Sequence, residues 1–428
     1  MSAPTTAPAE RDLIGQSVLT PISWRTPIIM AALAVLALFG FALFTPAHLQ
    51  SQIELTGGGA DWQLPDLVIS SRGSALALVL VAFALAGLSF WTTQNRRRSV
   101  AIPVVFGACL VLAFLIWAVA GNASGLPLPF LLSTAMTAAL PLIFGAFAGL
   151  LCERSGVINI AIEGQLLAGA FLTAVLATVA GNPYIGLIAA PIGGALVGLL
   201  LAVFAIKYRV DQIIVGVVVN VLVLGLTSYL FSTVLSDNPL RLNSPPQLSS
   251  LRIPLLADIP VIGQALFNQN IIVYVMYVAV VLLHIGLFRS RWGLRVRAVG
   301  EHPKAADTVG IDVNRTRYRN VVFGSAVAGF GGASMVAAGL AFTKEVTEGR
   351  GYIALAAMIL GRWSPTGALA AALLFGFADS LNRVLNNIGS PVPYEILAML
   401  PYLATIFAVA GLVGRVRPPA GAGKAYPS

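Results

Sequence analysis

The sequence has little charge for its length. Only 10% of its 428 residues are Asp, Glu, Lys or Arg, whereas soluble domains carry about 25%. Hydrophobic residues make up 57% of the chain, and they fall in blocks of about twenty, the length of a helix that crosses a bilayer. These features exclude an ordinary soluble domain. They predict an all-α, polytopic membrane protein built as a helical bundle.

Cysteine and histidine are also scarce. Cys109 and Cys152 each lie in or next to an apolar block, and the three histidines are scattered along the chain. Two cysteines offer neither a disulfide framework nor the spacing of a metal site. The sequence contains no GxxxxGK[S/T] phosphate loop, no HExxH and no GxSxG, the motifs of nucleotide, zinc and acyl-transfer chemistry. We therefore predict no catalytic residue, no metal site and no cofactor bound by this chain.

The apolar blocks predict about twelve membrane spans. They cover residues 28–44, 73–91, 102–120, 130–151, 156–180, 184–206, 212–235, 271–288, 321–342, 352–361, 365–386 and 394–413. With residues 1–27 in the cytoplasm, alternation places both termini there and residues 236–270 outside. Most of the 26 Lys and Arg residues then fall on the cytoplasmic side, as the positive-inside rule requires. The net charge of +9 is thereby explained without nucleic-acid binding. The short span 352–361 is expected to be broken or re-entrant and held inside the protein.

The longest polar stretch, residues 288–320, carries much of the positive charge. Its basic residues are Arg289, Arg291, Arg295, Arg297, Lys304, Arg315, Arg317 and Arg319. Pro303 suits a first helical position and Gly310 the residue just past a helix end, which predicts a short surface helix between them. Ala305, Ala306 and Val309 fall at helical spacing and are expected to form a small apolar face open to another protein. The alternative is a topology signal that binds nothing, but such a signal needs only charge.

Polar side chains inside predicted spans are candidates for a substrate path. Asn159 and Glu163 are four residues apart, would share one face of a helix that starts at residue 156, and precede Gln165. Such groups should face the bundle interior or a wet cavity, because exposure to lipid costs ~2.5–3.5 kcal/mol. They would line a substrate path or form an interhelical hydrogen bond that fixes packing. Asn220 is a weaker candidate of the same kind.

A second polar stripe lies in the predicted span 365–386. Asp379, Asn382, Arg383 and Asn386 recur there at helical spacing, near the expected outer end. Asp379 and Arg383 could pair along the helix. The stripe is therefore either a neutralised pair at the membrane boundary or a set of substrate contacts.

Small residues recur at four-residue spacing in two spans. Gly145 and Gly149 form one pair, and Gly194 and Gly198 form another. This spacing predicts that helix backbones pack closely. It is common in membrane helices and carries no information on transport.

The central loop resembles the coupling segment of ABC-importer permeases. The residues that carry this resemblance are Arg295, Arg297, Gly300, Glu301, Pro303, Ala305, Ala306 and Gly310. The branch is the one serving branched-chain amino acids, simple sugars and nucleosides, and the stretch 153–171 is similar to its nucleoside-type members. The resemblance divides the chain into a cytoplasmic tail (1–27), two additional spans (28–100), a ten-span permease core (101–414) and a second cytoplasmic tail (415–428).

The resemblance implies a permease subunit of a bacterial inner-membrane importer for nucleosides or related simple sugars. It implies alternating access driven by separate ATPase subunits, which hold ATP and Mg²⁺, together with a second, related permease subunit and an extracytoplasmic substrate-binding protein. The alternative class is an ion-coupled secondary transporter with Glu163 or Asp379 as its proton or sodium site. Transport by the purified chain under an ion gradient alone would distinguish the two.

Overall fold

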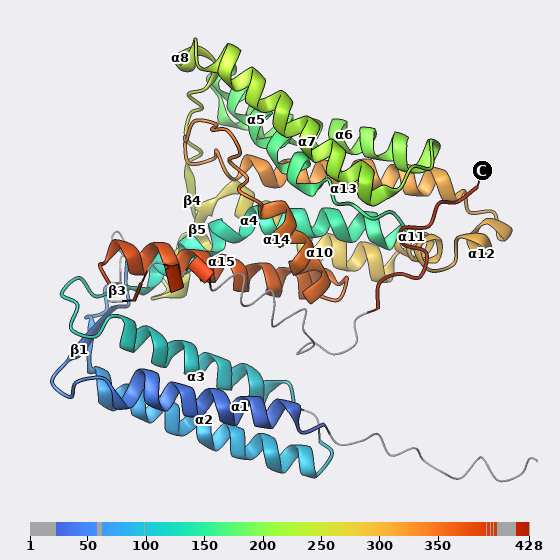
Figure 1. Ribbon diagram of the computed structural model, residues 1–428. Coiled ribbons are helices and arrows are strands. Elements are labelled where there is room, and N and C mark those ends of the chain that lie inside the picture. Colours follow the sequence, from blue (N-terminus) through green and yellow to red (C-terminus); the bar gives the residue numbers. More distant parts are fainter. Residues whose placement is uncertain are drawn as a thin grey trace, which may run out of the picture. The chain divides into compact units, whose positions relative to one another are not determined.

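The computed structural model describes residues 23–57, 62–97, 99–390, 392–393, 395–396, 398–399 and 417–427. Within these ranges the protein is built almost entirely from helices (Figure 1). Nine of the described helices are long and apolar enough to cross a membrane. The predicted all-α, polytopic class is therefore confirmed. The predicted span 394–413 and Arg98 lie outside the described residues, apart from four positions of that span.

The chain divides into two compact units. The first comprises Met1–Ser51 and Ile69–Gly121, and the second comprises Gln52–Val68 and Asn122–Ser428. The first unit thus contains three helices, whereas the predicted N-terminal addition contained two. These helices are α1 (Arg25–Ala37), which continues as the π-helical turn η1 (Leu38–Leu43), α2 (Ser71–Gln94) and α3 (Ala101–Ala118).

Small side chains hold the first unit together. Ala34, Ala82 and Ala86 are buried in one apolar cluster with Phe106, which brings the helices close because little bulk separates them. At one end of the helices, the hydroxyl of Ser51 donates to the carbonyl oxygen of Ile116 at 2.6 Å and bonds to the hydroxyl of Ser71 at 2.7 Å.

The second unit contains the remaining helices and most of the short strands. Its long helices are α4 (Leu128–Arg154), α5 (Ile162–Ala180), α6 (Pro183–Ala202) with η2 (Val203–Lys207), α7 (Gln212–Leu230) with η3 (Phe231–Leu235), α10 (Ile271–Arg289), α13 (Val313–Ala333) and α15 (Pro365–Asn387). Its short helices are α8 (Pro239–Leu242), α9 (Ile262–Phe267), α11 (Arg291–Glu301), α12 (Pro303–Thr308) and α14 (Arg350–Leu360).

The strands are short and lie in the connecting segments. They are β1 (Gln50–Glu54), β2 (Leu67–Ser70), β3 (Leu126–Pro127), β4 (Ser250–Arg252) and β5 (Asn268–Asn270). Ile53 pairs with Leu126 in a parallel β1–β3 ladder, and Ser250 pairs with Asn270 in an antiparallel β4–β5 ladder.

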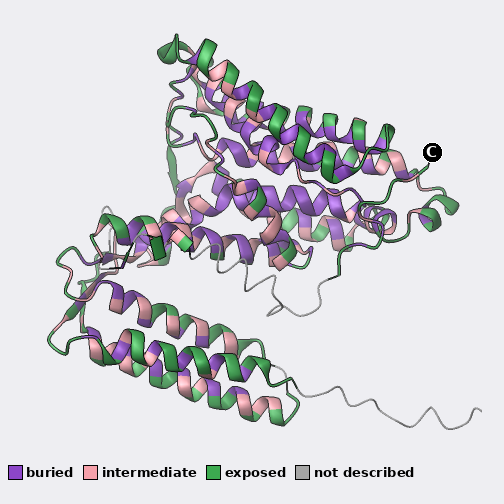
Figure 2. Ribbon diagram, in the orientation of Figure 1, coloured by how far each residue is buried: buried purple, intermediate pink, exposed green. Residues whose placement is uncertain are grey.

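Helix α4 is the central element of the second unit. It is buried along most of its length (Figure 2), and it packs against α13, α14 and α15. The predicted close approach at Gly145 and Gly149 is confirmed: a Cβ at these positions would lie 2.8 Å from Cβ of Ala354 and 2.9 Å from Sδ of Met358. Helix α14 therefore lies directly on the α4 backbone.

The second glycine pair brings α6 and α13 together. A Cβ at Gly194 would lie 2.1 Å from the carbonyl oxygen of Ser325, and one at Gly198 would lie 2.2 Å from the Ser325 hydroxyl. The prediction of close helix packing from this spacing is confirmed here as well.

Two predicted span boundaries are wrong. Helix α5 begins at Ile162 rather than at residue 156, because residues 157–160 have no regular structure. Helix α13 begins at Val313 rather than at residue 321 and ends at Ala333. Its start is fixed by Asp312, whose carboxylate accepts a hydrogen bond from the backbone N–H of Arg315 at 2.8 Å, so the basic residues that looked like loop belong to the helix.

Candidate functional site

A cavity of about 1080 Å³ lies in the second unit, at the N-terminal end of α4 and the C-terminal end of α15. Its walls also include the segment between α13 and α14 and both strands β4 and β5. The hydroxyl and amide side chains that line it are those of Thr134, Thr137, Gln247, Ser249, Ser250, Asn268, Gln269, Asn270, Ser334 and Asn387. Most of these groups can both donate and accept hydrogen bonds, so the cavity suits an uncharged, polar ligand.

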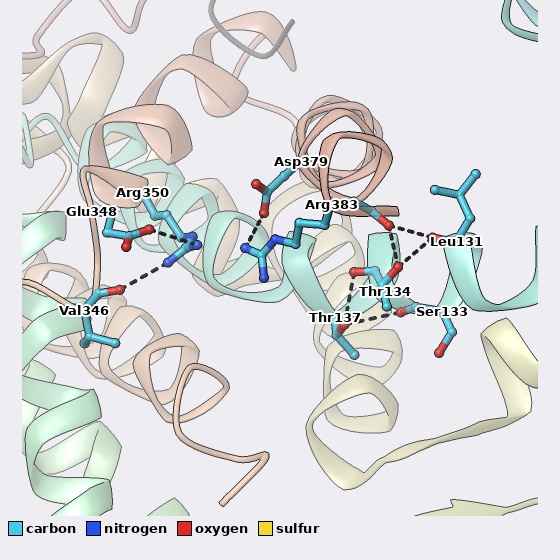
Figure 3. A network of polar contacts seen from close by, with 10 residues as sticks. Leu131, Ser133, Thr134, Thr137, Val346, Glu348, Arg350, Asp379 and Arg383 are labelled. Carbon is cyan, nitrogen blue, oxygen red and sulfur yellow. Dashed lines mark hydrogen bonds and ion pairs between the residues drawn. The ribbon is translucent and has the colours of Figure 1, made fainter. Parts of the chain in front are cut away.

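Two arginines reach the cavity from α14 and α15. Figure 3 shows the guanidinium groups of Arg350 and Arg383 directed toward each other. Each has its own carboxylate: Nη2 of Arg350 lies 3.4 Å from Oε2 of Glu348, and Nη2 of Arg383 lies 2.8 Å from Oδ2 of Asp379. The two charges are therefore balanced at the cavity wall.

The stripe of α15 contributes to this wall in part. Arg383 lines the cavity, and Asp379 orients it through the i,i+4 pair that the sequence suggested. Asn382 is half-buried and is not among the lining residues; its Oδ1 has no hydrogen-bond partner among the described residues. Sequence reasoning missed Arg350, because a single basic residue before an apolar block is also a common topology feature.

Asn159 and Gln165 form a closed pair away from the cavity. The amide of each donates to the side-chain oxygen of the other at 3.0 Å, and both residues are fully buried. The expectation that Asn159 and Glu163 share one helical face is wrong, because Asn159 precedes the first residue of α5. Gly156, with φ of +93°, lies where the chain leaves α4 and is in the left-handed region that favours glycine.

Glu163 lies in the first turn of α5 and binds the start of α14. Its Oε1 accepts a hydrogen bond from the backbone N–H of Gly349 at 2.9 Å, and its Oε2 accepts one from Gly351 at 2.6 Å. A Cβ at Gly351 would lie 2.4 Å from the backbone nitrogen of Glu163, so this approach requires glycine. Glu163 thus holds the backbone on both sides of Arg350.

Asn220 of α7 supports the same junction. Its side-chain oxygen accepts from the N–H of Gly164 at 2.8 Å, and its amide donates to the carbonyl oxygen of Ile160 at 2.9 Å and to the hydroxyl of Tyr352 at 3.3 Å. Backbone groups without regular structure at membrane depth need such partners. Of the four polar residues predicted around α5 and α7, Glu163 and Asn220 therefore hold the start of α14, whereas Asn159 and Gln165 pair with each other.

The central loop folds into two helices, α11 and α12. The predicted short helix after Pro303 is confirmed as α12, and Gly310 has the expected left-handed backbone with φ of +82°. The predicted apolar face is wrong in one residue. Ala305 and Val309 are exposed, whereas Ala306 is 3% exposed and packs in a cluster with Val299 and Val313.

The remaining loop residues bind the protein itself or solvent. Arg295 is exposed, whereas the guanidinium of Arg297 lies 5.4 Å from the ring centroid of Phe288. Gly300 is buried, and a Cβ there would lie 2.2 Å from the carbonyl oxygen of Arg154. The carboxylate of Glu301 accepts a hydrogen bond from the backbone N–H of Ala420 at 3.2 Å. The loop is therefore a folded surface element in contact with the C-terminal segment.

The turn between α14 and α15 is held by the last two residues of α4. The indole N–H of Trp363 donates to Oε2 of Glu153 at 2.6 Å. Nε and Nη2 of Arg154 donate to the carbonyl oxygen of Trp363 at 3.1 and 2.7 Å. Glu153 and Arg154 begin the stretch 153–171 that resembles nucleoside-type permeases, but the sequence did not indicate their partner.

A polytopic helical bundle with a polar cavity at one end of α4 and a short surface helix near the other is consistent with a membrane permease. Where the chain is described, no three His, Cys, Asp or Glu side chains come together as metal ligands. The chain belongs to the family described as branched-chain amino acid transport system / permease component, which matches residues 131–410.

Several relatives are transport permeases. The chain is 41% identical over 303 residues to the guanosine ABC transporter permease protein NupQ of Bacillus subtilis (strain 168), covering 67% of this chain and 93% of the relative. It is 36% identical over 296 residues to the nucleoside ABC transporter permease protein NupC of Lactococcus lactis subsp. cremoris (strain MG1363), with the same coverage. A putative glucose ABC transporter permease protein, TsgC13 of Haloferax volcanii, is 31% identical over 64% of this chain and 89% of the relative. No solved structure matches the chain.

Proposed function

We propose that this chain is a membrane-spanning subunit of a nucleoside ABC importer in a bacterial inner membrane. The observation that carries the proposal is the charge-balanced, hydrogen-bonding cavity between α4, α14 and α15, in a chain related to guanosine and nucleoside permeases. A nucleoside is uncharged and presents hydroxyl, amine and carbonyl groups, which amide and hydroxyl side chains recognise well. Phe130 of α4, also at the cavity wall, offers an aromatic surface to the base.

The importer would need partners for energy and delivery. Separate ATPase subunits would hold ATP and Mg²⁺ and dock on α12, where Ala305 and Val309 are exposed. A second, related permease subunit and an extracytoplasmic substrate-binding protein would complete the assembly. The cavity would open toward that binding protein, because the basic residues of the central loop favour the cytoplasmic side for the other end of α4.

Competition for uptake tests the substrate class. In cells that express the chain with its partner subunits, uptake of labelled guanosine should depend on ATP and be competed by unlabelled nucleosides. Guanosine monophosphate should compete poorly, because each of the two arginines that line the cavity is already paired with a carboxylate. Uptake by the purified chain under an ion gradient alone would refute the proposal in favour of the secondary transporter.

Charge balance can be changed at one residue. Asp379→Asn keeps the size of the side chain but leaves Arg383 without its anion, so guanosine monophosphate should become a better competitor. Asp237→Asn, an exposed acid outside the cavity, is the matched control. An unchanged preference for guanosine over guanosine monophosphate in Asp379→Asn would show that Arg383 takes no part in substrate selection.

Labelling of intact spheroplasts tests the orientation. In a background without Cys109 and Cys152, Ser249→Cys at the cavity wall should react with an impermeant thiol reagent. Ser99→Cys, in the α2–α3 connection, should react only after the membrane is opened. The reverse pattern would overturn the proposed orientation.

A further inference from the structure

Helix α14 is attached at its cavity end and at its opposite end to different helices. At the cavity end, the carboxylate of Glu163 holds the N–H groups of Gly349 and Gly351, one on each side of Arg350. Negative charge at this position also complements the helix dipole. Arg350 lines the cavity and is the first residue of α14. A displacement of α14 relative to α5 would therefore move Arg350 and strain the two hydrogen bonds to Glu163.

The opposite end of α14 runs into a constrained turn. Arg362 and Trp363 both have left-handed backbones, with φ of 54° and 50°, a conformation disfavoured for residues with a Cβ. Trp363 is only 6% exposed. Its hydrogen bonds to Glu153 and Arg154 hold the turn in this conformation, so the turn follows the end of α4.

The same end of α4 contacts the central loop, which is the surface loop formed by α11 and α12. Gly300 of α11 lies against the carbonyl oxygen of Arg154. The guanidinium groups of Arg154 and Arg297 lie 5.7 and 5.4 Å from the ring centroid of Phe288. A shift of α11 would therefore displace Arg154, whose guanidinium donates to the carbonyl oxygen of Trp363.

The contact between α14 and α4 lacks interlocking side chains at two positions. Gly145 and Gly149 have no side chain where Ala354 and Met358 of α14 pack, so at these two positions no α4 side chain interlocks with α14. A helix of eleven residues is about 16 Å long at 1.5 Å per residue. It is long enough to connect the Trp363 turn with the cavity wall as one rigid piece.

We propose that α14 is the element that transmits movement of the surface loop to the cavity, with Glu153, Arg154 and Trp363 as positioning residues at the loop end and Glu163 at the cavity end. This inference rests on the proposed importer function. Within this chain the movement passes through α14, and the buried Glu153–Trp363 hydrogen bond has a role in it beyond stability.

Thiol labelling at the cavity measures this transmission. Leu340 is 61% exposed and lines the cavity. Leu340→Cys, in a background without Cys109 and Cys152, is placed in the assembled complex with its ATPase subunits. The rate of maleimide labelling is compared with and without a non-hydrolysable ATP analogue. We expect nucleotide to change the rate severalfold in this parent.

Variants of the loop-end contact separate transmission from packing. Trp363→Phe removes the N–H donor, and Glu153→Ala removes the acceptor; each should abolish most of the nucleotide-dependent change in labelling rate, because the side-chain hydrogen bond between α4 and the Trp363 turn is lost. Glu153→Gln retains an acceptor oxygen and should keep the response. Trp91→Phe, at an exposed position of the first unit, is the control for loss of an indole.

The outcomes distinguish the inference from the function. A normal nucleotide response in assembled Trp363→Phe would overturn the inference. If Trp363→Phe does not assemble, Glu153→Ala and Glu153→Gln decide, and equal responses in these two overturn it. A parent that imports nucleosides without a labelling response to nucleotide refutes transmission alone. A parent without ATP-dependent uptake refutes the proposed function and the inference with it.

Discussion

Replacing Glu163 by Gln removes one charge and one acceptor oxygen from the junction between α5 and α14. The carboxylate accepts from Gly349 and Gly351 through separate oxygens, at 2.9 and 2.6 Å. An amide has one acceptor oxygen, so in either orientation its NH₂ group faces one of the two N–H donors. The substitution is therefore not a conservative one at this position, although it preserves size and shape.

The expected loss follows from these two contacts. One charge-assisted hydrogen bond contributes about 1.5–3 kcal/mol, and the lost charge at a helix N-terminus contributes about 0.3–1 kcal/mol more. The first turn of α14 should thus lose about 2–4 kcal/mol of local stability. At about 1.36 kcal/mol per factor of ten, hydrogen exchange that proceeds through local opening should accelerate about 30- to 900-fold.

Hydrogen exchange followed by mass spectrometry provides the assay. Peptides that cover residues 346–356 should exchange faster in Glu163→Gln, and Glu163→Ala should resemble it. Glu345→Gln, an exposed acid in the preceding segment, should exchange like the parent. Uptake by Glu163→Gln should show a raised KM, because Arg350 and Glu348 lose their fixed position. Parent-like exchange in Glu163→Gln combined with fast exchange in Glu163→Ala would refute the reasoning, since one acceptor would then suffice.

Three further expectations concern α12, the helix packing and the C-terminal segment. Ala305→Arg should abolish ATPase stimulation without changing the melting temperature, whereas Ala306→Arg should unfold the loop and lower that temperature, since its side chain is 3% exposed. Gly194→Ala should destabilise the bundle in detergent melting by at least about 1 kcal/mol because a backbone oxygen lies 2.1 Å from the new Cβ; Gly225→Ala, with open space around it, should be neutral or stabilising. The hydrogen bond from Tyr426 to a carboxylate of α12 raises the pKa of this phenol. The bond therefore stabilises the C-terminal segment against α12 at pH values below the ordinary tyrosine pKa of about 10, and this stabilisation is lost as pH rises through the raised pKa. When the ultraviolet titration curve of Tyr426→Phe is subtracted from that of the parent, the difference should show one phenol that ionises late.

Much of the fold was predictable because the physics that specifies it is local. Blocks of apolar residues define membrane helices by length alone, since a bilayer demands that backbone groups bond within each segment. The Pro303 start and Gly310 end of α12 depend on backbone geometry that only a few residue types adopt. The close packing at Gly145 could also be predicted, because it requires only that the residue at this position has no side chain.

The site required the tertiary structure, because its contacts join residues far apart in the chain. Helical periodicity placed Asn159 on α5, but a buried partner, Gln165, stabilises a non-helical backbone there. Glu163 was recognised as a polar group inside a span, yet its partners are backbone N–H groups of α14 that no side-chain pattern reveals.

The sequence by itself determined the membrane class, the positions of most helices and the exposed surface helix, since these follow from composition, helix ends and charge. Only the tertiary structure decided that Ala306 faces inward, that Arg350 and Arg383 meet at one cavity, and that Glu153 binds Trp363. The reason is that side-chain direction and pairing depend on which helices pack together. Which helices pack together depends on the whole bundle and on no single segment.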